Sequence, residues 1–166
     1  MLRCLFTHLL LAVCLLGCGQ EAALDDTRLL RNPTVPIGAI TRFEAARFDG
    51  RWNVRQSGGG AWDMRAFEVA GESTAWREQS GSAARTGTIV QRGPGILRIV
   101  YEGGDLRDLW VVWIDPDHQT AALGDPEGRF GFVVTRAGTA RADQITAARQ
   151  VLDFNGYRTE TWRDVP

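Results

Sequence analysis

The sequence predicts an all-β fold, an up-and-down antiparallel barrel or a sandwich, followed by one helix. Three observations predict it: eight runs of strand length lie between residues 51 and 136, turn-forming residues separate them, and the chain has 6 Trp and 19 Gly. Wide aromatic side chains favour strands, and glycine favours tight turns. Because the connections are short, consecutive strands can pair antiparallel, as they do in barrels and sandwiches.

The first 17 residues have the pattern of a secretion signal. Arg3 precedes an almost wholly apolar run over residues 5–16, which is too short for a membrane-spanning helix of roughly 20 residues. The run ends in Leu-Leu-Gly-Cys at residues 15–18, which resembles the lipobox of bacterial lipoproteins. That resemblance implies removal of residues 1–17 and a lipid anchor on Cys18. The alternative is a plain secretion signal with a chance cysteine at its end.

The residues around the anchor indicate where the protein resides. Gly rather than Asp follows Cys18, and the resemblance to sorted lipoproteins therefore implies the outer membrane, with the domain facing the periplasm. The other two cysteines, Cys4 and Cys14, would leave with the signal, so no internal disulfide can form. Residues 18–36 are mostly polar and are predicted to be a tether, which leaves residues 37–166 as one domain.

The eight predicted strands alternate in ways that assign their faces. Their ranges are 51–57, 61–69, 72–80, 85–92, 96–102, 106–114, 119–123 and 129–136. In the first strand, Trp52 and Val54 share one face, and polar side chains occupy the other. The sixth is apolar on both faces over residues 109–114, so another element should cover its outer face.

A helix after the eighth strand is the expected cover. Asp143 can cap it, and Gly156 stands where it would stop. Between them, apolar residues recur at helical spacing: Ile145, Ala148, Val151 and Leu152. Residues 157–162 are predicted to add a short ninth strand.

Three features of the chain resemble the lipocalin family, most closely its bacterial outer-membrane lipoprotein branch. Gly50 and Trp52 look like the Gly-x-Trp signature at the start of the family's first strand. Asp115 lies in the turn between strands six and seven, where the family often has Thr-Asp-Tyr and this chain has Asp-Pro-Asp-His, a partial match. Arg136 ends the eighth strand. The resemblance implies an eight-stranded up-and-down antiparallel β-barrel, with the helix packed outside and a short extra strand.

The alternation in the eighth strand independently points Arg136 inward, on the same face as Phe132 and Val134. A buried arginine is costly unless it is paired. Because strand one begins at the barrel end where strand eight finishes, Trp52 is the predicted neighbour, and an arginine over a tryptophan ring contributes roughly 0.5–2 kcal/mol. Residues 40–48 are predicted to close this end. The alternative is that Arg136 is a surface charge at a strand end.

The resemblance also implies that the barrel binds a hydrophobic small molecule, such as a fatty acid, a lysophospholipid or another amphiphile. An eight-stranded barrel can hold one small ligand or be filled by its own side chains. The end opposite Trp52 is predicted to be open. The expected ligand-contacting residues near it, with the two isoleucines deeper, are Met64, Trp76, Tyr101, Trp110, Phe130, Ile89 and Ile99. The alternative is a structural lipoprotein whose filled barrel contacts a periplasmic partner.

Other function classes lack the residues that they require. A pI of about 6.1 and a net charge of −1 argue against nucleic-acid binding. After Cys18 there is no cysteine, and His118 is the one histidine, which excludes the commoner zinc sites and a cysteine nucleophile. We therefore expect no enzymatic activity, no metal and no cofactor.

Overall fold

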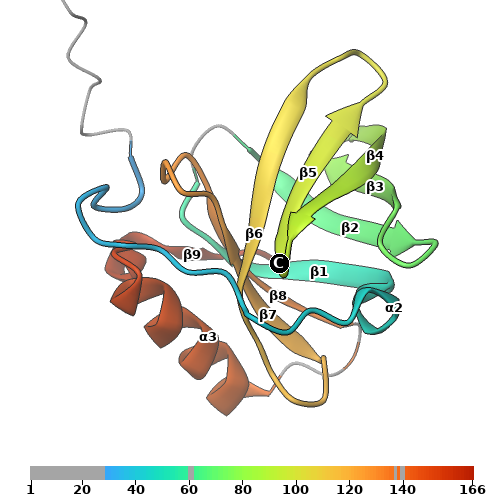
Figure 1. Cartoon of the computed structure of the whole chain (residues 1–166). Helices are drawn as coiled ribbons and strands as arrows, with labels where there is room; N and C mark the ends of the chain where they lie inside the picture. The colour runs from blue at the N-terminus through green and yellow to red at the C-terminus, as the bar shows by residue number, and fades with distance from the viewer. Residues whose placement is uncertain (1–28, 60–61, 137, 139–140) are drawn as a thin grey trace, which may run out of the picture.

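The computed structural model describes residues 29–59, 62–136, 138 and 141–166. The predicted signal sequence, Cys18 and most of the predicted tether lie outside these residues. Within them the chain forms a β-barrel with one long helix against its outer surface (Figure 1). No helix of the described residues is long and apolar enough to cross a membrane.

Eight antiparallel strands close into the barrel, each paired with the next along the chain. Their bounds are β1 Gly50–Ser57, β2 Met64–Ala70, β3 Ala75–Ser80, β4 Ala83–Gly93, β5 Ile96–Tyr101, β6 Leu106–Ile114, β7 Thr120–Gly124 and β8 Gly131–Thr135. Because β1 pairs with both β2 and β8, the sheet has no free edge within the ring of eight. The predicted up-and-down barrel is therefore confirmed, and the sandwich is excluded.

Two hydrophobic clusters lie on opposite sides of the barrel wall. The interior cluster contains aromatic and aliphatic side chains from all eight strands, including Trp52, Phe67, Trp76, Ile99, Leu109 and Phe132. The outer cluster consists of Val112, Ala122, Val133, Ala148, Leu152, Tyr157 and Trp162. Strand β6 supplies both, because its side chains are apolar on both faces: Leu109 and Val111 point inward, and Val112 points outward.

The helix α3 (Ala142–Phe154) covers β6, β7 and β8, as predicted from the apolar outer face of strand six. Ala148 and Leu152 are fully buried against the barrel. The predicted start is wrong, because Asp143 lies in the first turn and Arg141 occupies the cap position without a side-chain cap. Asp143 instead forms an ion pair with Arg141 at 2.7 Å. Gly156 follows the helix with a positive φ of 87°, as expected of a stop.

The extra strand exists but lies further along the chain than predicted. Strand β9 (Arg163–Asp164) pairs with β1 at Gln56 and Ser57. Residues 157–162 do not form a strand, because Tyr157 and Trp162 both enter the outer cluster. Residues five positions apart would point to opposite faces of a strand. A 3-10 helix (Thr159–Thr161) between them brings both rings to the same side.

The described part of the predicted tether is packed against the domain rather than free. Arg31 is 2% exposed and donates hydrogen bonds to the backbone carbonyls of Pro126 and Asn155. The amide of Leu30 donates to the carbonyl of Gly128 at 2.7 Å. From Leu30 onward, the chain therefore belongs to the domain, which begins seven residues before the predicted start at residue 37.

Candidate functional site

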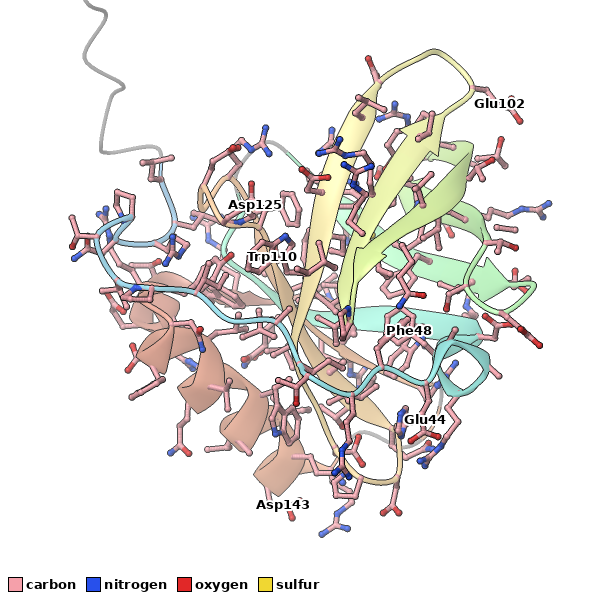
Figure 2. All side chains as sticks on the ribbon, viewed as in Figure 1. Glu44, Phe48, Glu102, Trp110, Asp125 and Asp143 are labelled. Atoms are coloured by element: carbon pink, nitrogen blue, oxygen red, sulfur yellow. The ribbon has the colours of Figure 1, made fainter. Side chains whose placement is uncertain are left out.

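The two ends of the barrel are built differently. We call the end where β1 begins and β8 finishes the closed end, and the opposite end, at the β1–β2, β3–β4, β5–β6 and β7–β8 connections, the open end. Ile40 and Phe43 pack against the interior cluster, and Phe48, in the short helix α2 (Ala45–Phe48), belongs to it. Figure 2 shows Phe48 beside the start of β1. Residues 40–48 thus close this end, as predicted.

Trp52 and Arg136 form the predicted pair at the closed end. The Trp52 side chain is fully buried, and its Nε1–H donates to the carbonyl of Phe48 at 2.9 Å. The guanidinium carbon of Arg136 lies 3.9 Å from the Trp52 ring centroid. Arg136 also donates to the carbonyls of Arg47 at 2.7 Å and His118 at 3.3 Å. The alternative, a surface charge at the strand end, is therefore wrong.

Gly50 makes room for that arginine. Its φ is 105°, a conformation that L side chains rarely adopt. A Cβ atom at this position would lie 2.7 Å from a terminal nitrogen of Arg136. The positive φ therefore requires the glycine of the Gly-x-Trp pattern, and the absence of a Cβ leaves room for the end of the Arg136 side chain.

Asp115 organises the turn between β6 and β7. Its carboxylate is buried and accepts hydrogen bonds from the backbone amides of Asp117 at 3.0 Å, Gln119 at 2.7 Å and Thr120. The Gln144 side chain of α3 donates to it at 3.3 Å. The role of Asp115 is therefore to hold the turn and to connect it to the helix. Among the described residues, no group of three His, Cys, Asp or Glu side chains could hold a metal ion.

A column of aromatic rings fills the barrel from the closed end toward the open end. Trp52 lies 6.3 Å from Phe67, measured between ring centroids, and Phe67 stacks on Trp76 at 4.5 Å. Trp62, from the β1–β2 connection, continues the column at 6.1 Å from Trp76 and 4.7 Å from Phe130. At these levels the interior is occupied by the protein's own side chains.

Six of the seven predicted ligand-contacting residues lie inside the barrel. They are each 5% exposed or less: Met64, Trp76, Ile89, Ile99, Tyr101 and Phe130. Their contact with a ligand stays a prediction. Trp110 was wrongly placed, because it packs against the outer cluster (Figure 2). Its neighbours Leu109 and Val111 point inward. Because the sixth strand is apolar on both faces, the sequence does not indicate which face is the inner one.

The open end contains a buried carboxylate that the sequence analysis missed. Glu78 on β3 is 2% exposed. It accepts hydrogen bonds from Tyr101 Oη at 2.6 Å, Trp76 Nε1 at 2.9 Å, Trp62 Nε1 at 3.0 Å and Ser80 Oγ at 3.3 Å. A signal existed: Glu78 is two residues from the inward Trp76, so strand alternation places both on the same face.

Two arginines lie over the rings that bind Glu78. The guanidinium carbon of Arg85 is 3.8 Å from the Tyr101 ring centroid, and that of Arg107 is 4.6 Å from the Trp62 ring centroid. Arg85 also pairs with Asp105 at 2.8 Å. Burial and the hydrogen bond to Glu78 raise the pKa of Tyr101 far above its usual value, so this hydroxyl stays a donor. At the open end, the Glu78 carboxylate can therefore accept hydrogen bonds among mainly aromatic side chains.

Comparisons with known proteins agree on the fold. No protein-family model and no curated protein match the sequence. Solved structures do: lobster apocrustacyanin A1 is 14% identical, with a TM-score of 0.56 over 79% of this chain and 89% of that one. The bovine lipocalin allergen Bos d 2 is 8% identical, with a TM-score of 0.52 over 72% and 93%. The LTBP1 protein, solved in complex with LTC4, is 14% identical, with a TM-score of 0.50 over 76% and 88%. The fold is that of the lipocalins.

Proposed function

We propose that the protein is a lipid-anchored lipocalin of the bacterial outer membrane that binds a hydrophobic small molecule in its barrel and catalyses no reaction. One observation carries this proposal. The closed barrel encloses apolar side chains along its length, and a buried hydrogen-bonding centre lies inside its open end, at Glu78. Ligand pockets commonly combine apolar walls with a few placed polar groups in this way.

The fold and the lining favour an apolar ligand. Each CH₂ group moved from water into such an interior contributes about 0.8 kcal/mol. The LTBP1 protein, which shares the fold, was solved as a complex with LTC4. A catalytic role is not part of the proposal, because His118, the one histidine after the signal, lies in the β6–β7 turn at the closed end.

The position of the N-terminal segment supports an anchored domain whose open end lies near the membrane. Leu30 is bonded to Gly128 in the β7–β8 connection, which belongs to the open end. Cys18 precedes Leu30 by twelve residues, and twelve residues extend at most about 40 Å. A lipid on Cys18 would therefore hold the open end within that distance of the bilayer, where a ligand could pass between membrane and barrel.

Two experiments test this proposal. The first is a tryptophan-fluorescence titration of the purified protein with fatty acids and lysophospholipids, together with mass spectrometry of what co-extracts with it. A saturable change in fluorescence is expected, because Trp62 and Trp76 both donate a hydrogen bond to Glu78, the polar centre of the proposed site. The second is the Cys18→Ser variant, which should move to the soluble fraction with its fold intact. A variant that stays in the membrane pellet would refute the anchor.

A second candidate function is favoured by the ring column. Because the rings contact one another from Trp52 to Phe130, the barrel could be a rigid body that contacts a periplasmic partner. Its outer face offers a hollow of about 460 Å³, lined partly by Arg51, Arg55 and Arg65. Absence of both a saturable titration and a co-extracted lipid would favour this candidate over ligand binding.

A further inference from the structure

We infer that the ligand of this barrel carries a neutral hydrogen-bond donor, of the hydroxyl type, which binds the Glu78 carboxylate in the position now held by the indole N–H of Trp62. This inference rests on the proposed function and gives its ligand a chemical class. It favours long-chain alcohols over fatty acids, although both carry the apolar chain that the proposed function assigns to the barrel.

The buried carboxylate sets the requirement for a donor. A charge removed from water is costly unless hydrogen bonds compensate it, and an ionised carboxylate can only accept them. Four side chains now donate to Glu78, at 2.6 to 3.3 Å. Any group that displaces one of them must therefore donate in its turn, or the carboxylate loses a partner in an apolar enclosure.

Trp62 is the donor that a ligand can replace. Trp76 and Ser80 belong to β3 and Tyr101 to β5, so the hydrogen bonds of the sheet fix their backbones. Trp62 precedes β2 and lies outside every strand. Its indole reaches Glu78 at 3.0 Å and lies 4.7 Å from Phe130, measured between ring centroids. Of the four donors to Glu78, it is the one whose backbone lies outside the sheet.

The charges around Glu78 disfavour a ligand carboxylate. A fatty acid placed at the Trp62 position would bring a second anion to hydrogen-bonding distance of Glu78. Of the two neighbouring cations, Arg85 is paired with Asp105 and lies over Tyr101, and Arg107 lies over the Trp62 ring. A neutral hydroxyl avoids the repulsion and still supplies the donor.

Three ligands of nearly equal size test the inference: decanol, which donates; methyl nonyl ether, which does not; and decanoate, which is anionic. Tryptophan fluorescence of the purified protein at pH 7.5 measures their binding. Decanol should bind at least about tenfold more tightly than either of the others. Equal or tighter binding of the ether or of decanoate would overturn the inference and leave the proposed function intact. Failure of all three to bind would count against the proposed function itself.

Two variants and one control locate the effect. Glu78→Gln removes the negative charge, and the preference for decanol over decanoate should fall by about tenfold. Glu68→Gln, an exposed position on the outer face of β2, should leave that preference unchanged. Trp62→Phe keeps a ring but removes the indole donor, so the affinity for decanol should rise. An unchanged preference in Glu78→Gln, or an unchanged affinity in Trp62→Phe, would contradict the inference. Near-ultraviolet circular dichroism verifies that each variant is folded.

Discussion

The closed and open ends of the barrel repeat one arrangement, a buried tryptophan beneath an arginine, and connect it to different partners. At the closed end, Arg136 lies over Trp52, whose N–H binds the carbonyl of Phe48 four residues earlier. At the open end, Arg107 lies over Trp62, whose N–H binds the side chain of Glu78 on another strand.

The two ends differ in whether a ligand can replace one of the hydrogen-bonding groups. The backbone carbonyls of Arg47, Phe48 and His118 belong to the chain that closes the barrel, so no ligand can take their place without opening it. A side-chain carboxylate can exchange one donor for another without a change in the fold. The closed end is therefore expected to contribute stability, and the open end to bind.

The largest expected effect is at the closed end. Trp52→Ala should lower the free energy of unfolding by about 3–5 kcal/mol, because the ring is fully buried among Phe48, Phe67 and Arg136 and its loss leaves a cavity. Urea unfolding followed by circular dichroism measures it. A loss below about 1 kcal/mol would show that this ring does not hold the closed end together.

The corresponding change at the open end should cost less. Trp62→Ala is expected to lower the free energy of unfolding by about 3 kcal/mol, the lower end of the range for a buried tryptophan, because Trp62 lies outside the strands and its surroundings can relax more easily. The same urea experiment applies, with Trp52→Ala measured in parallel. A cost equal to that of Trp52→Ala would remove the distinction between the two ends.

Alkaline pH should act on the open end and on the outer cluster, and not directly on the closed end. The chain has two tyrosines, Tyr101 beside Glu78 and Tyr157 beside Asp125. Burial raises the pKa of both, assisted by the hydrogen bond to Glu78 for Tyr101 and by the negative charge of Asp125 for Tyr157. When the folded state raises the pKa of a tyrosine, its contribution to the stability of the fold is complete at pH values below the pKa of the unfolded state, about 10. As the pH rises above that value, this contribution declines.

The expected decline is about 1.4 kcal/mol per pH unit for each tyrosine that ionises on unfolding. Urea unfolding between pH 9 and pH 11 measures it, and tyrosinate absorbance should appear together with unfolding. Tyr101→Phe should reduce the slope by half. Tyrosinate absorbance in the folded protein near pH 10 would contradict the burial of these hydroxyls.

The smallest effect concerns the arginine over Trp52. Arg136→Met keeps an apolar stem but removes the charge and its hydrogen bonds to backbone carbonyls, and the expected loss is roughly 0.5–2 kcal/mol. Thermal unfolding measures it. Arg55→Met, at an exposed position on the outer face of β1, is the matched control and should leave the stability unchanged. Equal stability of the two variants would show that Arg136 does not brace the ring.

Much of the fold followed from local patterns. Alternation in the first and fifth strands placed Trp52, Ile99 and Tyr101 on the interior face, and the helical spacing around Ala148 identified the covering helix. The pairing of Trp52 with Arg136 followed from strand order and alternation together. These inferences succeeded because a period of two or of 3.6 residues decides which side chains share a face.

Other features depend on contacts between distant segments. Trp110 could not be assigned a face, because the sixth strand is apolar on both sides. Arg31 gave no sign of burial, since its carbonyl partners lie 95 and 124 residues further along the chain. A polar segment can therefore belong to the domain when residues far along the chain accept its hydrogen bonds.

The sequence by itself determined the strand order, the covering helix and the inward faces of the first, fifth and eighth strands, since these depend on periodicity and turn chemistry within short windows. Only the tertiary structure decided which polar groups meet inside the barrel. Glu78, Tyr101 and Trp62 come from three separate segments, and a carboxylate can remain buried only where closure of the barrel brings enough donors to it.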